Sequence, residues 1–152
     1  MPKPQILYVA VSDIEAAPQG SKKHVGRGRL VETCKRLKPW RRAVAQAARV
    51  QMNDQKLPIF DVPVDVQLLF RFNRPKSHFR ANGDLRPNAP KHYFVKKNDI
   101  DKITRSTLDA LVMGGAMKDD CLVVRLIAEK RYCHLFEPPG VLITVSTLPD
   151  NA

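Results

Sequence analysis

The sequence predicts an α/β protein of the α+β type, in which a small mixed β-sheet packs with two main helices. We expect a single domain over residues 1–152, because 152 residues with 43% hydrophobic content fit one core and leave little room for a second. Two segments carry apolar residues at helical spacing, and several others alternate or are rich in β-branched residues. Strands and helices are therefore expected to share that core.

The N-terminal part of the chain predicts a strand, a hairpin and a helix. Residues 6–11 (ILYVAV) are typical of a strand, and the Gly-rich basic stretch 17–29 (APQGSKKHVGRGR) is predicted to form a loop or a hairpin with residues 29–33. The first helix is expected within the segment 37–52, from Pro39 at its first position onward. Its helical spacing is carried by Trp40, Val44, Ala47, Ala48 and Gln51.

The next element is a half-buried strand over residues 62–72 (VPVDVQLLFRF), where apolar and polar residues alternate with a period of two. The expected core face carries Val62, Val64, Val66, Leu68 and Phe70, and the opposite face carries Asp65, Gln67 and Arg71.

The C-terminal part predicts a second helix and two strands. Asp99 is the expected N-cap of a helix that runs to Met113 and ends before two glycines. Its helical spacing is carried by Ile100, Ile103, Thr107 and Leu111. Residues 121–132 and 141–148 are β-rich, and we expect these two strands to pair across the Pro-Pro-Gly turn between them.

A long basic loop separates the middle strand from the second helix. Apolar residues in the segment 74–98 follow neither the helical nor the strand spacing. The segment holds seven Lys and Arg residues and one acid, Asp84, so its local charge is +6. Phe79, Tyr93 and Phe94 are interleaved among these cations, a mixture common in nucleic-acid-binding segments. The whole chain has a formal charge of +11, which favours a polyanionic partner, most often nucleic acid. The alternative is a solvated basic loop without a ligand.

Cysteine, histidine and the N-terminus give little functional signal. The three cysteines have no C-x-x-C spacing, so neither a disulfide framework nor a zinc site is indicated, and the four histidines have no metal-binding spacing. Residues 6–11 are too short an apolar run for a membrane span or signal peptide, so a cytoplasmic location is expected. Trp40 is expected in the core, although its place beside two arginines would also suit stacking on a DNA base.

Acidic residues gather in one short stretch of this basic chain: Asp99, Asp101, Asp109, Asp119 and Asp120. An N-cap carboxylate and one in the first helical turn can converge beside the positive end of the helix. Asp119 and Asp120, in the turn before the next strand, can complete the cluster. Three convergent carboxylates with water form a hard oxygen site that suits Mg²⁺, which can activate water against a phosphodiester.

An alternative explanation needs no metal. Asp99 can serve only as a helix cap, Asp101 can pair with Arg105 one turn later, and Asp119 with Asp120 can form an ordinary turn. The position of these acids directly after the basic loop favours the metal site, because one surface would then attract phosphates and present metal to them.

The segments NDIDKITRSTLDAL and KDDCLVVRLIAEKRY resemble the signature of the RusA family of Holliday junction resolvases, D-x-D-N-L-x-K-x-x-x-D-A-L followed by D-D, a strand and a Lys. Upstream segments such as LKPWRRAVAQAA resemble the phage-borne branch of that family. The resemblance implies a small RusA-like α/β homodimer in the cytoplasm of a bacterial host. Such an enzyme binds four-way DNA junctions and nicks two opposed strands with Mg²⁺, for which Mn²⁺ can substitute, in DNA recombination and repair.

Matched by position, the resemblance makes Asp99, Asp101 and Asp120 the catalytic metal ligands, with Asp119 as a neighbouring candidate. Arg105 stands where the family has Lys and would steady the cleaved phosphate, although its geometry differs from that of Lys. Asp109 also matches and is expected to be structural. The residues expected to bind DNA are Lys76, His78, Arg80, Lys91, Lys96, Lys97, Lys102 and Lys130.

Two alternatives to a junction resolvase stay open. One is a nuclease acting on other branched DNA, such as flaps or replication forks. The other is a non-catalytic DNA-binding module, because Lys102 replaces the usual Asn and Arg105 the usual Lys of the signature.

Overall fold

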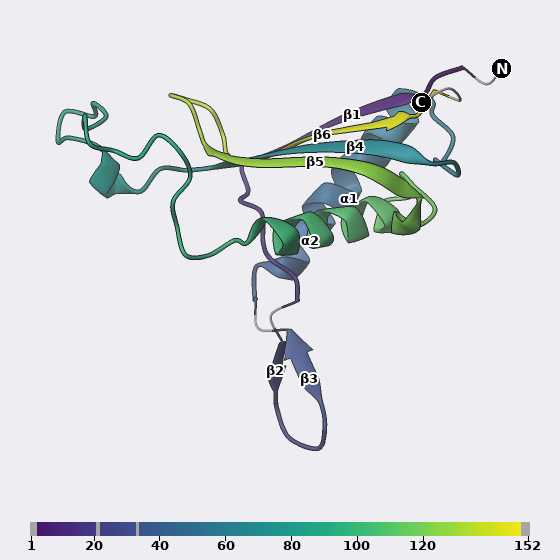
Figure 1. Cartoon of the computed structure of the whole chain (residues 1–152), viewed down its shortest axis with the longest axis horizontal. Helices are drawn as coiled ribbons and strands as arrows, with labels where there is room; N and C mark the ends of the chain where they lie inside the picture. Colours follow the sequence, from purple (N-terminus) through teal and green to yellow (C-terminus); the bar gives the residue numbers. More distant parts are fainter. Residues whose placement is uncertain (1–2, 21, 33, 150–152) are drawn as a thin grey trace.

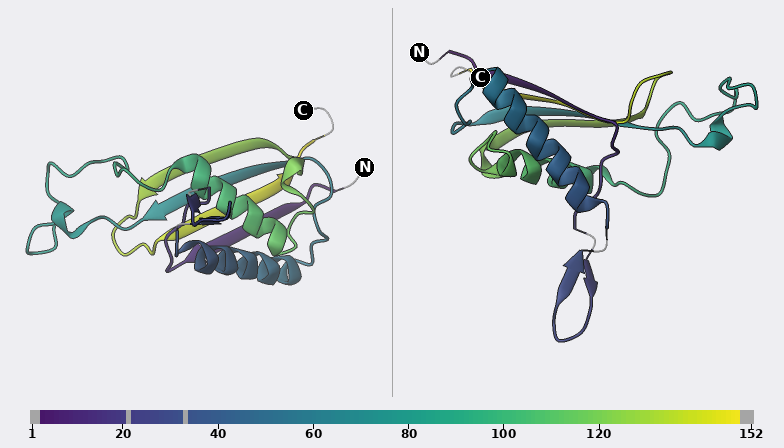
Figure 2. Two further views of the ribbon diagram at one scale, coloured as in Figure 1. Left: turned by 90° about the horizontal axis from the view of Figure 1, so that it is seen from below. Right: turned by 180° about the vertical axis from the view of Figure 1, so that it is seen from behind.

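The structure, a computed structural model, describes residues 3–20, 22–32 and 34–149. A four-stranded mixed sheet has the order β1-β6-β4-β5, and helices α1 and α2 cover one of its faces (Figures 1 and 2). The strands of this sheet are β1 (Ile6–Ser12), β4 (Val64–Phe72), β5 (Val123–Tyr132) and β6 (Gly140–Thr147), and the helices are α1 (Leu37–Asp54) and α2 (Ile100–Met113). The predicted fold class is therefore confirmed.

A separate hairpin and two short 3₁₀ turns complete the structure. The hairpin pairs β2 (Lys22–His24) with β3 (Leu30–Glu32) in antiparallel fashion, as the Gly-rich stretch between them predicts. The 3₁₀ turns are η1 (Lys76–His78), inside the basic loop, and η2 (Asp120–Leu122), directly before β5. Among the described residues, no helix is long and apolar enough to cross a membrane.

The predicted pairing of the last two strands is wrong. β6 lies between β1 and β4 and is antiparallel to both, whereas β5 pairs with the other side of β4 in parallel. The physical reason is the crossover: α2 carries the chain back along the sheet, so the next strand starts where β4 starts and runs beside it. β4, the most deeply buried strand, then takes a central position with a hydrogen-bonded neighbour on each side.

The core lies between the sheet and the two helices. Trp40 is fully buried, as expected, and its indole Nε1 donates a hydrogen bond of 3.3 Å to Thr107 Oγ1, which joins α1 to α2. At the end of α2, a Cβ on Gly114 would lie 2.4 Å from the Ala45 carbonyl oxygen, so glycine allows the close approach to α1. The largest fully buried aliphatic and aromatic side chains include Leu7, Val44, Phe60, Phe70, Ile103, Leu111 and Ile143.

The helix ends differ from the sequence prediction in detail. Pro39 is the third residue of α1, which begins at Leu37. Asp99 occupies the predicted N-cap position of α2, but its side chain makes no capping hydrogen bond. The Asp99 carboxylate therefore does not serve as the helix cap that the metal-independent explanation requires.

Candidate DNA-cleavage site

The start of α2 presents two exposed carboxylates. Asp99 is the N-cap residue and Asp101 lies in the first turn, where unpaired backbone N–H groups favour negative charge. The Asp99 side chain is 63% exposed, and its Oδ2 lies 3.7 Å from Lys102 Nζ. The two carboxylates therefore lie at one helix end, with the cation of Lys102 in the same first turn, and their role as metal ligands stays a prediction.

Strand β5 brings another cation to the same end of α2. Lys130 Nζ donates a hydrogen bond of 3.1 Å to the carbonyl oxygen of Asn98, the residue before Asp99, and lies 4.8 Å from the centre of the Tyr93 ring. Asn98 is buried, and its side-chain amide donates to the Tyr93 hydroxyl at 3.0 Å. These contacts fix the backbone that leads into the two carboxylates.

Asp119 and Asp120 form a second acidic pair, in the turn before β5. The Asp119 carboxylate accepts a hydrogen bond of 3.1 Å from the Cys121 backbone N–H, which lowers the pKa of Asp119. A hydrogen bond with Asp119, some desolvation and the negative charges of Asp119 and Asp109 raise the pKa of Asp120. Both residues are exposed, so this pair is an acidic patch open to solvent.

The two acidic pairs do not meet within one chain. Asp99 and Asp101 lie at the start of α2, and Asp119 and Asp120 follow its end; a 14-residue helix spans about 20 Å at 1.5 Å per residue (Figure 1). Over the described ranges, no group of three or more His, Cys, Asp or Glu residues could hold a metal ion. A three-carboxylate Mg²⁺ site is therefore not assembled from this single chain, and the expected convergence does not occur.

Arg105 lies one turn after Asp101 on α2 and is exposed. None of the ion pairs between described residues joins it to Asp101, so the pairing offered by the metal-independent explanation is not formed. Its guanidinium reaches the segment before β2, because a Cβ on Gly20 would lie 3.1 Å from Arg105 Nη1. A role of Arg105 in cleavage stays a prediction.

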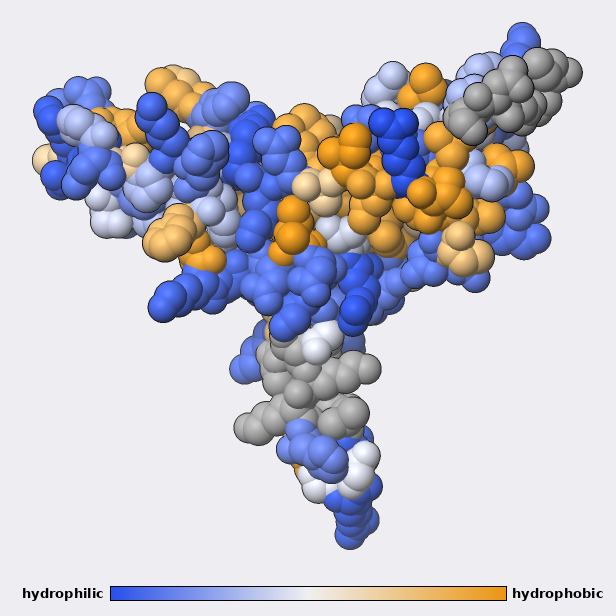
Figure 3. All heavy atoms as spheres, viewed as in Figure 1, coloured by the Kyte–Doolittle hydropathy of each residue, from blue (hydrophilic) through white to orange (hydrophobic). Residues whose placement is uncertain are grey.

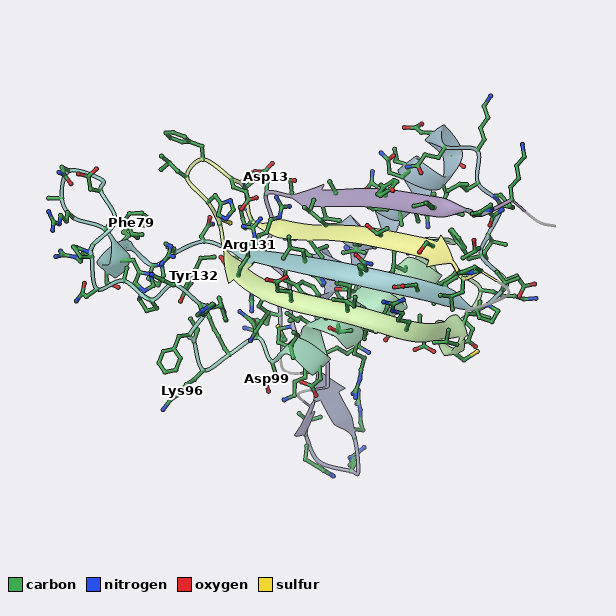
Figure 4. All side chains as sticks on the ribbon, turned by 45° about the horizontal axis from the view of Figure 1, so that its top comes forward. Asp13, Phe79, Lys96, Asp99, Arg131 and Tyr132 are labelled. Carbon is green, nitrogen blue, oxygen red and sulfur yellow. The ribbon has the colours of Figure 1, made fainter. Side chains whose placement is uncertain are left out.

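The basic loop extends from the end of the sheet that lies nearest the start of α2 (Figure 1). Its exposed cations include Lys76, Arg80, Lys91, Lys96 and Lys97. Figure 4 shows Asp99 at the point where the loop enters α2, and Lys96 on the preceding part of the loop with its side chain directed outward. The loop therefore delivers positive charge directly beside the first acidic pair.

His78, a predicted DNA contact, and Tyr93, one of the aromatic residues among the loop cations, have internal roles in the structure. His78 packs edge-on against Tyr132, with ring centres 5.3 Å apart, and its Nδ1 lies 3.3 Å from Arg74 Nη1. Tyr93 packs against Phe72 and Tyr132 at 4.7 and 5.2 Å between ring centres. These aromatic contacts, which have no periodic signal in the sequence, anchor both ends of the loop; contact of His78 with DNA stays a prediction.

Sequence reasoning missed an apolar loop next to these cations. Phe136 is 96% exposed, and Leu135 is 77% exposed in the same connection between β5 and β6. A groove lined by Arg74, Phe79 and Leu85 of the basic loop also includes these two residues. The sequence did contain a signal for this loop: Leu135 and Phe136 are two consecutive apolar residues beside the Pro-Pro-Gly turn, and residues beside such a turn are usually exposed to solvent.

Cations and acids thus share one end of the molecule, while a further acidic pair lies beyond the other end of α2. The family model described as endodeoxyribonuclease RusA matches residues 13–146, which includes both acidic pairs and the whole basic loop. A search of curated proteins finds no match. RusA endonucleases resolve Holliday junctions in DNA recombination, and the match confirms the resemblance stated above. The chain belongs to the RusA family of endodeoxyribonucleases.

Proposed function

We propose that this chain is a Mg²⁺-dependent, structure-selective endodeoxyribonuclease that resolves four-way DNA junctions by paired nicks during recombination and repair. The observation that carries the proposal is that two features adjoin in the chain: the basic loop ends at Asn98, and the exposed carboxylates of Asp99 and Asp101 come directly after it. Membership of a family of DNA endonucleases supports the same reaction.

Electrostatics gives the two features complementary tasks. Exposed cations of the loop attract the phosphate backbone over a distance comparable with the Debye length, about 8 Å at physiological ionic strength. The backbone at Asn98, which is fixed by hydrogen bonds with Tyr93 and Lys130, then holds Asp99 and Asp101 in one place relative to the bound DNA strand. A nuclease needs this combination, since carboxylates alone repel DNA and cations alone bind it without cutting.

The proposed metal dependence rests on the donor type. Asp99 and Asp101 offer carboxylate oxygens, the ligands that Mg²⁺ and Mn²⁺ prefer, and Mg²⁺ is commonly held by one or two carboxylates together with water and phosphate oxygens. Asp120 and Asp119 are the remaining proposed ligands, although this chain places them beyond the far end of α2. Omission of Mg²⁺ or addition of EDTA is expected to abolish nicking and leave DNA binding.

We further propose that the enzyme acts as a homodimer. A four-way junction offers two symmetry-related scissile phosphates, and a two-fold dimer presents two equivalent sites to them. Arg105, Lys102 and Lys130 would contact phosphates near the cut, and the loop cations Lys76, Arg80, Lys91, Lys96 and Lys97 would contact the arms.

Cleavage mapping on a synthetic mobile four-way junction with Mg²⁺ tests the proposal. We expect paired nicks at symmetric positions in two opposed strands, with a linear duplex of the same sequence left intact. Preferential cutting of a flap or a fork would support the first alternative. Junction binding that is unaffected by EDTA, without cleavage of any substrate, would identify a non-catalytic DNA-binding module and overturn the proposal.

A further inference from the structure

The connection between β5 and β6 carries an exposed aromatic side chain at its tip. Phe136 is 96% exposed and Leu135 77%, so the fold gains little stability from burying either side chain. Phe136 also has a φ of 63°, in the left-handed region that bulky residues rarely adopt. In Figure 3, which has the orientation of Figure 1, apolar residues stand out at the tip of this connection, next to the mainly hydrophilic arm of the basic loop. An exposed aromatic ring on such a backbone indicates a binding function.

The turn that holds Phe136 is fixed by its neighbour Glu137. Both carboxylate oxygens of Glu137 accept hydrogen bonds from Arg131, at 2.5 and 3.0 Å, and Oε1 also accepts one of 3.0 Å from the His134 backbone N–H. The Glu137 backbone N–H donates in turn to the His134 carbonyl oxygen at 3.0 Å. The Phe136 ring therefore stands on an ordered turn, and its binding to a partner loses less conformational entropy than binding by a loose loop. The same contacts neutralise the charge of Glu137, which would otherwise repel a phosphate backbone.

An apolar groove lies between this turn and the basic loop. Phe136 and Leu135 line it from the β5–β6 connection, and Phe79 and Leu85 line it from the basic loop. Phe79 and Leu85 are joined by a β-bridge, and both loops leave the same end of the sheet (Figures 1 and 4). The groove has a volume of about 670 Å³, within the range of about 300 to 1,000 Å³ that is usual for sites of small organic molecules. It thus offers an aromatic ring from each of two loops to a flat apolar group.

Positive charge surrounds the groove. Arg74 lines it, and of the two acids in its lining, Asp84 and Glu137, the second is neutralised by arginine. The exposed cations of the basic loop that lie close in sequence to its groove residues are Lys76, Arg80 and Arg86. An apolar groove within a cationic surface suits a group that combines a flat ring with phosphate, which is a nucleotide of DNA. A second copy of this chain suits it less well, because the same cations would repel each other across the contact.

A run of packed side chains connects the groove with the first acidic pair. Arg74 lines the groove, and its guanidinium carbon lies 4.5 Å from the centre of the Tyr132 ring. Tyr132 packs against Tyr93 at 5.2 Å between ring centres. The Tyr93 hydroxyl accepts a hydrogen bond of 3.0 Å from the side chain of Asn98, the residue directly before Asp99. A base held in the groove would therefore set the position of its strand relative to the carboxylates at the start of α2.

A branch point can supply a base to this groove more easily than a continuous duplex can. Removing a base from the stack costs free energy, and this cost is lower where the helix is interrupted than within a duplex arm. We propose that Phe136 stacks on a nucleobase that is unpaired at the branch point of the DNA, and that the groove between Phe136 and Phe79 receives this base. The inference rests on the function proposed above and specifies the feature of branched DNA that the enzyme recognises. Every base has a π face, so the contact accepts any of the four.

Junction affinity of Phe136 variants tests the stacking. In EDTA, which prevents metal-dependent cleavage, Phe136→Ala is expected to lower the affinity for a four-way junction by about fivefold to a hundredfold, the effect of losing one aromatic–base stack. Its affinity for a linear duplex should stay unchanged. Phe136→Trp should keep the wild-type junction affinity, and Phe136→Leu, which is apolar but has no π face, should not. Fluorescence anisotropy measures these affinities. Wild-type junction binding by Phe136→Ala, or an equal loss on linear duplex, would overturn the proposal.

Tyr8→Ala is the matched control for the loss of an exposed ring. Tyr8 is 60% exposed on β1, at an edge of the sheet and outside the groove lining, and its variant should bind the junction as the wild type does. Neither substitution removes a core side chain, so circular dichroism should give wild-type spectra for both variants. An equal loss of junction affinity in Tyr8→Ala and Phe136→Ala would exclude a specific site at Phe136.

A cycle that combines changes in the protein and in the DNA locates the base. One base beside the branch point at a time is replaced with an abasic site, and the wild type and Phe136→Ala are titrated with each junction. At the position that the groove receives, the wild type should lose affinity by the same factor as Phe136→Ala loses on intact DNA. The variant should lose nothing further there, because the stack can be removed only once. Independent losses at every position would rule out a stack on Phe136.

Sedimentation distinguishes a DNA contact from a contact between subunits. Phe136→Ala should sediment as the wild type does at equal protein concentration. A lower mass for the variant would place Phe136 in a subunit interface and would contradict the proposal.

The outcomes separate this inference from the proposed function. If the wild type nicks no branched DNA in Mg²⁺, but the abasic cycle in EDTA shows coupling to Phe136 at one position, the function fails and the base site stands. If the wild type nicks junctions, while Phe136→Ala binds them with wild-type affinity, the base site fails and the function stands.

Discussion

Asp101 lies in the first turn of α2 and Asp120 lies beyond its last, so one helix separates two exposed carboxylates that we propose as metal ligands. Neither residue is buried, and neither is needed for the core. The surrounding chain is strongly cationic, with a formal charge of +11. Substitution of either carboxylate should therefore affect chemistry and DNA binding in opposite directions.

Asp101→Asn and Asp120→Asn should each nearly stop nicking in Mg²⁺ while junction binding in EDTA survives or tightens. The amide keeps the side-chain size but removes one negative charge that repels phosphate. If these residues only capped a helix or shaped a turn, the cost would be about 1 kcal/mol of stability, and the folded protein would stay active. Melting temperature, junction affinity and nicking rate on the same variants distinguish the two cases; full nicking by Asp120→Asn would contradict a metal site.

Junction affinity should fall steeply with salt, because each phosphate contact changes the logarithm of the binding constant by about −0.9 per unit of log salt. Replacement of the exposed Lys76, Arg80 and Lys91 with Ala should make this slope shallower by the amount that corresponds to the loss of up to about three phosphate contacts. Fluorescence anisotropy at several salt concentrations measures it.

The matched control for the basic loop removes the same charge elsewhere. Arg42, Arg49 and Lys56 are exposed on α1 or just after it, and their triple Ala variant should keep the wild-type slope. An unchanged slope in the loop variant, or an equal loss in the control, would remove the loop from the DNA surface.

Arg105→Ala should lower the nicking rate roughly tenfold to a thousandfold with little change in binding, the range observed when one charge-stabilising donor is lost. Arg105→Lys should recover much of the rate, because it restores the cation of the family signature. Single-turnover cleavage at saturating enzyme separates this effect from affinity. Normal cutting by a folded Arg105→Ala would leave the residue a surface cation near Gly20.

Glu137 should make the protein less stable as the pH falls below about 4.5. Hydrogen bonds from Arg131, assisted by the His134 backbone N–H and the charge of Arg71, lower the pKa of Glu137 from 4.5 to about 2. A depressed folded-state pKa stabilises the protein above the unfolded value, and this contribution disappears as pH falls from 4.5 toward 2. Glu137→Gln should flatten the pH dependence of the unfolding free energy in this window, measured by urea titration.

The control for the Glu137 variant is Asp54→Asn, which removes an exposed carboxylate at the end of α1. Loss of charge-assisted hydrogen bonds should also cost Glu137→Gln about 1.5 to 3 kcal/mol at neutral pH. If Glu137→Gln has wild-type stability at pH 7 and its unfolding free energy changes with pH below 4.5 as in the wild type, the contact between Glu137 and Arg131 contributes nothing to stability.

The sequence by itself determined the local elements and the chemistry of the chain. Helical spacing from Ile100 to Leu111 and alternation from Val64 to Phe70 predicted α2 and β4, because both patterns arise from the geometry of neighbouring residues. The acidic signature and the basic loop identified the family, since residue type and spacing need no knowledge of the fold. Trp40 was placed in the core for the same reason.

Only the tertiary structure decided which elements are neighbours. β6 pairs with β4 and β1, although β5 adjoins it in sequence, because strand pairing depends on distant contacts that a local pattern does not encode. Tyr93 and His78 anchor the loop through Tyr132, a residue far away in the chain. The two acidic pairs are close in sequence but lie at opposite ends of α2. The helix rises about 1.5 Å per residue, so its 14 residues keep the two pairs about 20 Å apart.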